Sequence, residues 1–297
     1  MVRQGESLVV ETPAKLNLFL EVLGRRVDGY HDLETVMLAV SLCDTLHFRT
    51  AGQGELRFHQ KLALTGDSAR TGAPSAGDDN LVLRAARRLA EVTGCRRGAA
   101  IELTKRIPWQ AGMGGGSSDA AATLLALNVL WELRLSVVEL HAIAASLGSD
   151  LNFFIARTPL ALCRGRGEVV EPRPLRRRLD FVVVQPRGGL STAAVFQWWR
   201  RHSTVASPDR LLAWLAGEAG VDPRSAAYNA LQQPACQLHA GIDNVCRRLS
   251  GSGVMQPRLT GSGSACFGLC RTRRQAECVA RRWRMCSSAR AWAVSSI

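Results

Sequence analysis

A glycine-rich run over residues 107–119 contains the residue types and spacing best suited to chemistry. Its sequence is Ile-Pro-Trp-Gln-Ala-Gly-Met-Gly-Gly-Gly-Ser-Ser-Asp, and an alanine- and leucine-rich segment follows it. That segment predicts a helix over about residues 117–131, capped by Ser117 or Ser118. Glycines let backbone amides approach a ligand closely, and the first amides of a helix lack acceptors within the helix. A loop that leads into a helix in this way favours binding of a phosphate group.

The run differs from the two common glycine-rich nucleotide motifs. It lacks the closing Gly-Lys-Ser or Gly-Lys-Thr of a Walker loop, and its glycines do not fit Gly-x-Gly-x-x-Gly followed by an acidic residue. It also contains no lysine or arginine, so its backbone amides would provide most of the contacts with a phosphate. A glycine-rich turn without a ligand is the alternative interpretation.

Two charged residues outside the run, one lysine and one aspartate, are candidates for contacts with a phosphate group or its acceptor. Lysine is rare in this arginine-rich chain, so a retained lysine such as Lys15 indicates a specific role for a compact charge. Residues 7–23 alternate as a strand does, which places Lys15 and Asn17 on the same face. Asp150 follows the end of a predicted helix, where a carboxylate can face a cleft. A surface lysine and a capping aspartate are the alternatives.

The remaining pattern predicts a mixed α+β protein with mostly antiparallel sheets. A helix is predicted to begin near Asn80 and to end before Gly94, and Ser136 with Glu139 forms a capping box for another. The segment 171–178, rich in proline and arginine, marks the predicted domain boundary. Further strands are predicted at 36–42, 55–59, 100–107, 181–184 and 290–296, and further helices around 195–199, 209–217 and 273–283.

Composition narrows the function classes. A chain of 297 residues favours two domains, and neither a transmembrane helix nor a secretory signal is expected, since no long uncharged apolar run occurs. Nine scattered cysteines without a Cys-x-x-Cys pair indicate reduced thiols in a cytoplasm rather than disulfides or a zinc site. The net charge of +13 makes nucleic-acid binding an alternative, although the dispersed arginines favour small anionic substrates.

Five motifs together carry a resemblance to a known family. They are Pro-Ala-Lys-Leu-Asn-Leu at 13–18, Gly-Tyr-His-Asp-Leu at 29–33, the glycine-rich run, Gly-Ser-Asp at 148–150 and Leu-Thr-Gly-Ser-Gly-Ser at 259–264. Over residues 13 to about 267 the chain resembles the GHMP small-molecule kinases, and within them the branch of 4-diphosphocytidyl-2-C-methyl-D-erythritol kinases.

This resemblance implies an α+β, two-domain GHMP kinase architecture. An N-terminal ATP-binding α/β domain with a ribosomal-protein-S5-like fold would span residues 1–170. A C-terminal, ferredoxin-like α+β substrate domain would span residues 171–297, and the active site would lie in the cleft between the two.

The resemblance also implies the reaction. ATP would donate its γ-phosphoryl group to the 2-hydroxyl of 4-diphosphocytidyl-2-C-methyl-D-erythritol, giving the 2-phosphate and ADP in the non-mevalonate isoprenoid pathway. Lys15 and Asp150 would be the catalytic pair, with Asp150 as a general base or as a group that orients the hydroxyl. Mg²⁺ would accompany ATP, and Ser118 is the nearest hydroxyl for it in the run. A GHMP kinase of the mevalonate or homoserine type is the alternative within the superfamily.

The binding residues follow from the same resemblance. The cytidyl group would be held by His31 at the edge of the base and by Tyr30 stacked on it, with Phe196 as a second aromatic or simply as a core residue. No specific nucleic acid, membrane or obligate protein partner is expected. The predicted ATP-binding residues are Pro108, Gly112, Met113, Gly114, Gly115, Gly116, Ser117, Ser118, Asn80, Leu81 and Lys105. The predicted substrate-binding residues are Asn17, Tyr30, His31, Thr192, Phe196, Gly261, Ser262 and Gly263.

The chain departs from the family pattern in three places, at four residues. Gln110 stands in the run where a small residue is usual, and it would either narrow the access of a phosphate or point outward. Asn152 replaces a common proline after Asp150. Ala230 and Gln232 replace the acidic residues of an Asn-Asp-Leu-Glu block. These departures concern peripheral contacts. Trp198 and Trp199 are interpreted as packing residues.

Overall fold

The computed structural model describes residues 1–4, 7–63, 77–201, 204–220, 227–285 and 289–297. The chain divides into two compact units that interleave along the sequence. Unit 1 consists of Met1–Ala14, Leu42–Trp109 and Gly114–Arg157, and unit 2 consists of Lys15–Ser41, Gln110–Met113 and Thr158–Ile297. The sequence division into 1–170 and 171–297 stays a prediction beside these interleaved units.

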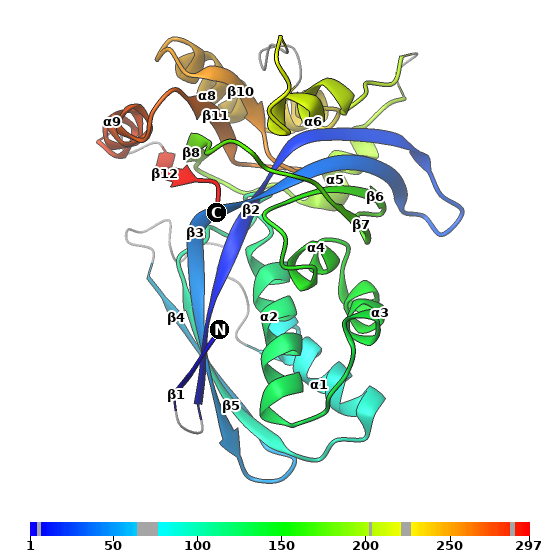
Figure 1. The fold of residues 1–297 in the computed structure, drawn as a ribbon. Coiled ribbons are helices and arrows are strands. Elements are labelled where there is room, and N and C mark those ends of the chain that lie inside the picture. The colour runs from blue at the N-terminus through cyan, green and yellow to red at the C-terminus, as the bar shows by residue number, and fades with distance from the viewer. Residues whose placement is uncertain (5–6, 64–76, 202–203, 221–226, 286–288) are drawn as a thin grey trace. The chain divides into compact units, whose positions relative to one another are not determined.

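Unit 1 combines strands with a group of helices. Its strands are β1 (Val2–Gln4), β4 (Leu56–Leu62), β5 (Gly98–Lys105) and parts of β2 (Ser7–Arg25) and β3 (His31–Ala51). β3 pairs with β5 in antiparallel fashion, while β4 and β5 run parallel. The helices α1 (Leu81–Thr93), α2 (Gly115–Leu130), α3 (Val137–Leu147) and α4 (Leu151–Ile155) lie together beside these strands (Figure 1).

Unit 2 contains a four-stranded antiparallel sheet in the order β10-β11-β8-β12. These strands are β10 (Met255–Leu259), β11 (Cys266–Cys270), β8 (Asp180–Pro186) and β12 (Ala289–Ser295). Helices α8 (Ala240–Ser250) and α9 (Arg273–Arg284) pack against it (Figure 1). The core between them is apolar and includes Val182, Leu249 and Trp283. Burial of such side chains contributes about 25 cal/mol per Å² of apolar surface.

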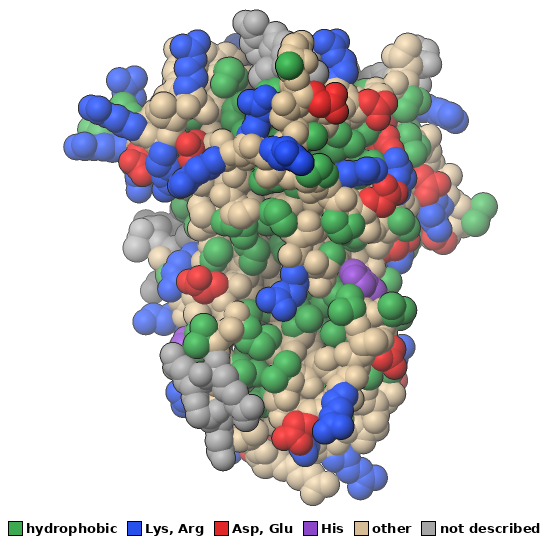
Figure 2. Space-filling view, viewed as in Figure 1, with side chains coloured by type: hydrophobic (Ala, Val, Ile, Leu, Met, Phe, Trp, Pro, Cys, Tyr) green, Lys and Arg blue, Asp and Glu red, His purple; other side chains and the backbone are tan. Residues whose placement is uncertain are grey.

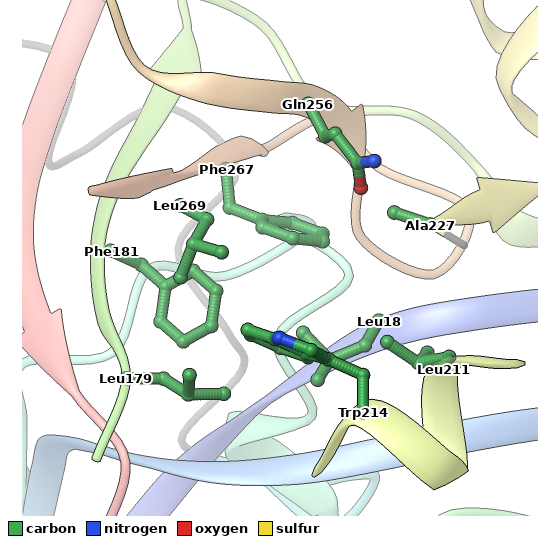
Figure 3. A pocket seen from close by; sticks show the side chains of 9 residues that line it. All are labelled: Leu18, Leu179, Phe181, Leu211, Trp214, Ala227, Gln256, Phe267 and Leu269. Atoms are coloured by element: carbon green, nitrogen blue, oxygen red, sulfur yellow. The ribbon is translucent and has the colours of Figure 1, made fainter. Parts of the chain in front are cut away.

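The rest of unit 2 surrounds parts of β2 and β3. β6 (Leu160–Gly165) pairs with β3 and with β7 (Val169–Pro172), and β9 (Tyr228–Asn229) runs parallel to β2. The helices α5 (Thr192–Trp198), α6 (Asp209–Leu215) and α7 (Gln232–Leu238) complete the unit. Near α6 a cavity of 30 Å³ is lined mainly by apolar side chains such as Phe181, Trp214 and Phe267 (Figure 3). It has room for about one or two waters but offers them few polar partners, so we interpret it as a packing gap.

Most sequence-based expectations about the elements are confirmed. The described sheets are mostly antiparallel, with β4–β5 and β2–β9 as parallel pairs. Asn80 caps α1 by accepting from the Val82 amide, and Gly94 ends the helix with a φ of 66°. The capping box of Ser136 and Glu139 is present at α3. The segment 173–178 carries no helix or strand and is largely exposed.

The predicted start of the helix after the glycine-rich run is wrong by two residues. α2 begins at Gly115, and its N-cap is Gly114 with a φ of 70° rather than Ser117 or Ser118. Glycine can take this left-handed conformation without the steric cost that a side chain would add, so the helix opens inside the glycine run. Ser118 therefore lies within the first turn of the helix and is buried.

Candidate active site

The start of α2 in unit 1 presents backbone amides that have no acceptor inside the helix. The amide of Ser118 donates to the Gly114 carbonyl at 2.9 Å, which is the first hydrogen bond of the helix. The amides of Gly115, Gly116 and Ser117 precede it and so have no acceptor within the helix. They stand at the positive end of the helix dipole, which suits an anionic group such as a phosphate.

Close packing explains why residue 115 in this turn is a glycine. A Cβ on Gly115 would lie 2.8 Å from Cγ2 of Ile107 and 3.2 Å from Nζ of Lys105, so a side chain does not fit. A Cβ on Gly116 would meet only Cδ1 of Leu81 at 3.5 Å, an ordinary contact. The helix start therefore rests directly on the end of β5.

Ser118 supplies a buried hydroxyl to this turn. Its side chain is 2% exposed, and Oγ has no hydrogen-bond partner among the described residues. A buried polar atom without a partner costs about 1–3 kcal/mol, so this oxygen is suited to a ligand that arrives at the helix start. A phosphate oxygen or a phosphate-bound Mg²⁺ fits a hydroxyl in this position.

Lys105 lies beneath the helix start in a buried ionic network. Its ammonium group donates to Asp119 Oδ2 at 2.8 Å and also to Asp44, and Thr12 donates to the other Asp119 oxygen at 2.8 Å. Burial raises the pKa of Asp119 to about 6, while the charge of Lys105 opposes this rise. Burial alone would lower the pKa of Lys105, but the two carboxylates raise it. The ammonium group of Lys105 is thus bound to two carboxylates, and its predicted nucleotide-side role stays a prediction.

The other predicted residues of unit 1 lie at element ends. Asn80 caps α1, Leu81 is its first residue, and Pro108 is buried just after β5. Asp150 takes the N-cap position of α4 but makes no side-chain capping hydrogen bond there. Capping of α4 therefore does not account for this carboxylate.

Lys15 and Asn17 are adjacent in unit 2, as their spacing predicts. Both are buried, and Lys15 Nζ donates to Asn17 Oδ1 at 2.5 Å. The Asn17 amide group donates to Thr35 Oγ1 at 2.8 Å, and Thr35 donates to the Phe19 carbonyl at 2.6 Å. The Lys15 amide donates to the Met113 carbonyl at 2.9 Å. These bonds fix the ammonium group beside the first half of the glycine-rich run.

A second glycine loop, residues 260–264, packs against the first in unit 2. A Cβ on Gly112, whose φ is 72°, would lie 2.0 Å from the Thr260 carbonyl oxygen. A Cβ on Gly261 would lie 3.3 Å from both Lys15 Nζ and Asn17 Oδ1. The Asn17 amide donates to Thr260 Oγ1 at 3.1 Å. The two glycine loops and the Lys15 ammonium group therefore meet at one place.

The segment that departs from the family pattern supports this second loop. Asn229 Nδ2 donates to the carbonyls of Leu259 and Gly261 at 2.8 and 2.9 Å. Gln232 Oε1 accepts from the Leu259 amide at 3.2 Å. Ala230 is buried in the core. A neutral Gln232 thus retains a backbone contact with the loop.

Gln110 also has a definite place in unit 2. It adopts a φ of 51°, and its side chain occupies the space beside Gly189, where a Cβ would lie 2.0 Å from Gln110 Oε1. The residue is exposed, and its backbone carbonyl accepts from the Ser264 amide at 3.0 Å. Asn152, which also departs from the family pattern, is buried in α4 of unit 1.

An aromatic cluster forms around His31 in unit 2. The His31 and Phe196 rings stack with centroids 4.9 Å apart, and Trp199 meets His31 edge-on at 5.7 Å. Burial and the charge of Arg25 lower the pKa of His31, so its ring is neutral at pH 7. Tyr30 is 54% exposed, with the Arg166 guanidinium 5.0 Å above its ring. A neutral imidazole between aromatic rings can recognise the edge of a planar base.

Hydroxyl groups connect α5 with the second glycine loop. Thr192 Oγ1 and Ser262 Oγ lie 2.9 Å apart in unit 2. Both residues were predicted to bind substrate, and the structure brings them together. Gly263 lies in the same loop, where its φ is 89°.

Within each unit, sequence reasoning missed several residues that contact the predicted site residues. Asp119 and Thr260 stand inside motifs that were identified, so their position was a usable signal. Asp44 and Thr35 carry no local signal, because only strand pairing brings them to Lys105 and Asn17. Trp199 packs against the core of unit 2, as interpreted from the sequence, and its ring also contacts His31.

Comparison with known proteins decides the family. The models "GHMP kinases N terminal domain" and "GHMP kinases C terminal" match residues 80–156 and 222–286. A protein from Acidovorax sp. (strain JS42), named 4-diphosphocytidyl-2-C-methyl-D-erythritol kinase, is 43% identical over 87% of this chain and 86% of its own length. The chain belongs to the GHMP kinases, in the family of 4-diphosphocytidyl-2-C-methyl-D-erythritol kinases.

Solved structures agree with this family and with the predicted fold class. A crystal structure of 4-(cytidine 5'-diphospho)-2C-methyl-D-erythritol kinase matches 97% of this chain and 98% of its own, with a TM-score of 0.79 and 35% identity. Homoserine kinase from Cytophaga hutchinsonii matches with a TM-score of 0.71 at 17% identity, which shows a shared fold. The two-domain α+β architecture of the GHMP kinases is thereby confirmed. Within the described ranges, no helix is long and apolar enough to cross a membrane.

Proposed function

We propose that this chain phosphorylates the 2-hydroxyl of 4-diphosphocytidyl-2-C-methyl-D-erythritol with ATP, giving the 2-phosphate and ADP in the non-mevalonate isoprenoid pathway. Membership of the family supports this activity over the other reactions of GHMP kinases. The structural observation that carries the proposal is the meeting of Lys15 with both glycine loops.

Phosphoryl transfer depends on positioning and on stabilisation of charge more than on covalent chemistry. The unpaired amides at the start of α2 would bind the β- and γ-phosphates. Lys15, held by Asn17, would stabilise the charge that develops on the transferred group. Asp150 would accept a hydrogen bond from the acceptor hydroxyl and either orient it or take its proton.

Mg²⁺ is proposed to accompany ATP. Ser118 Oγ is the hydroxyl that we propose to face the ion, because it is buried at the helix start and has no hydrogen-bond partner among the described residues. When bound, the ion neutralises charge on the phosphates. The described residues contain no cluster of three or more His, Cys, Asp or Glu side chains that could hold a metal ion.

The cytidyl group is proposed to bind at the aromatic cluster of unit 2. His31, neutral and stacked on Phe196, would address the edge of the cytosine, and Tyr30 would stack on the base. The hydroxyls of Thr192 and Ser262 and the backbone of Gly261 and Gly263 would contact the polar part of the substrate. Asn80, Leu81 and Lys105 are proposed to line the adenine side.

We propose that the enzyme is cytoplasmic and that its ligands are small molecules. The dispersed cysteines, without a paired spacing, favour a reducing compartment. On the face shown in Figure 2, Lys and Arg side chains are scattered among Asp and Glu rather than gathered in one patch. This distribution favours small anionic substrates over a nucleic acid.

An assay of ADP release tests the proposal. The purified chain is supplied with ATP, Mg²⁺ and, in separate reactions, 4-diphosphocytidyl-2-C-methyl-D-erythritol, mevalonate, homoserine or galactose. We expect turnover with the cytidyl substrate alone. Turnover with mevalonate or homoserine in its place would assign the chain to another acceptor and overturn the proposal.

A further inference from the structure

Two cysteines in the core of unit 2 lie in contact outside the candidate active site. Cys246 is on α8 and Cys266 is the first residue of β11. Their Sγ atoms are 3.5 Å apart. A disulfide bond is about 2.0 Å long, so a relative movement of about 1.5 Å between the sulfurs would join them.

The two thiols differ in access and in acidity. Cys246 is 9% exposed, whereas Cys266 is fully buried. The hydrogen bond with Cys266 lowers the pKa of Cys246 against the effect of burial, and the nearby charge of Arg258 adds to this. The same hydrogen bond and burial raise the pKa of Cys266. Because the thiolate is the reactive form, Cys246 is the thiol that meets an oxidant first.

We propose that Cys246 and Cys266 form a modification site, in which a peroxide converts the pair into an internal disulfide. The Cys246 thiolate attacks one peroxide oxygen, the O–O bond breaks, and a sulfenic acid and hydroxide form. The Cys266 sulfur then attacks the sulfenic sulfur, and its proton leaves with the hydroxyl group as water. Two thiols and one hydrogen peroxide thus give one disulfide and two waters.

The position of Cys266 connects this reaction to the proposed function. The preceding residue, Ala265, accepts from the Thr260 amide at 3.0 Å and donates to the Ala111 carbonyl at 3.2 Å. Ser264 donates to the Gln110 carbonyl at 3.0 Å. We expect the new bond to draw Cys266 toward α8 and to shift the adjacent backbone, which joins the two glycine loops beside Lys15. This consequence rests on the proposed kinase activity, and we expect oxidation to reduce it.

Peptide mapping after oxidation tests the site independently of activity. The full chain is treated with hydrogen peroxide, the remaining thiols are blocked, and peptides are identified by mass without reduction. We expect a peptide pair linked through Cys246 and Cys266, a loss of kinase activity, and recovery of both thiols and activity with dithiothreitol. Cys246→Ser should form no linkage and keep its activity after the same treatment, and Cys246→Ala provides a second variant if the first does not fold. Cys278→Ser, at an exposed thiol on α9, should respond as the wild type does.

Three results would overturn the inference. One is oxidation that leaves Cys246 as a sulfenic or sulfinic acid without a partner. Another is a linkage from Cys246 to Cys236, the other thiol whose charge influences this pair. A third is a Cys246–Cys266 linkage with unchanged activity, which would remove the connection to the loops. If the untreated chain shows no kinase activity, the proposed function fails while the mapping still decides the disulfide.

Discussion

At the scale of single residues, Lys15 and Asp150 are the side chains that we propose to act at the transferred group. Lys15→Met and Asp150→Asn should each lower kcat by about 10²–10³, as expected when one charge or donor is lost from such a site. Thermal unfolding should show that both variants remain folded. Lys61→Met is the matched control, because Lys61 is exposed on β4 and should retain full activity. A Lys15→Met enzyme with wild-type kcat would remove Lys15 from the mechanism.

His31 should control the recognition of the cytidyl group but not of ATP. His31→Ala removes the ring that stacks on Phe196, so KM for the cytidyl substrate should rise while KM for ATP stays nearly unchanged. Steady-state kinetics with each substrate varied in turn measures both constants. His59→Ala, at an exposed position on β4, is the control and should change neither constant. Equal changes in both KM values for His31→Ala would disprove the assignment.

Asp119 should make stability depend on pH in a defined direction. Its pKa is about 6 in the folded protein, against 3.8 for the ordinary group, because burial disfavours the charge. The folded state therefore binds more protons than the unfolded state between these values, and this contribution to stability falls as pH rises from about 4 to 6. Urea unfolding of the wild type and Asp119→Asn at intervals from pH 4 to 7 measures it. The difference in the free energy of unfolding between the wild type and Asp119→Asn should change with pH up to about pH 6 and stay constant above it. A difference that is constant from pH 4 to 7 would contradict the raised pKa of Asp119.

At the scale of elements, the junction between β5 and α2 determines where the backbone amides lie that we propose to bind phosphate. Gly115→Ala should destabilise the protein by about 1–3 kcal/mol, because its Cβ would overlap Ile107 and approach Lys105. The same substitution should raise KM for ATP, because the added Cβ would shift the helix start whose amides are proposed to bind phosphate. Gly116→Ala is the matched control: its Cβ has room beside Leu81, and alanine favours a helix over glycine by about 1 kcal/mol. Urea unfolding should separate the two variants, and equal destabilisation would show that packing at residue 115 is not the cause.

The same element shows why sequence patterns locate a loop better than its boundary. Capping preferences favoured Ser117 or Ser118 as the N-cap of the helix. The structure instead uses Gly114, and it places Ser118 and Asp119 inside the buried first turn. Thr12 on β2 and Lys105 on β5 donate hydrogen bonds to Asp119. Local sequence patterns do not predict these contacts.

At the scale of the whole molecule, the charge of +13 predicts weak attraction to any polyanion. Duplex DNA should bind weakly at about 50 mM salt and be released by about 200 mM, because dispersed arginines give only counterion-driven contacts. Fluorescence anisotropy with a labelled duplex of arbitrary sequence measures this, and added duplex should leave ADP release unchanged at the higher salt. Tight binding that survives the higher salt would favour the nucleic-acid alternative.

The amino-acid sequence by itself determined the family, the α+β class and the motifs that carry the proposed chemistry. These features are local, since glycine, proline and capping residues act through the backbone within a few positions. Tertiary structure alone decided which residues hold those motifs in place: Thr35 at Asn17, Asp44 and Asp119 around Lys105, and Asn229 behind the second glycine loop. Each of these contacts joins segments far apart in the chain, or strands whose register is set by burial of a shared core. The spacing of residues along the sequence therefore does not predict these contacts.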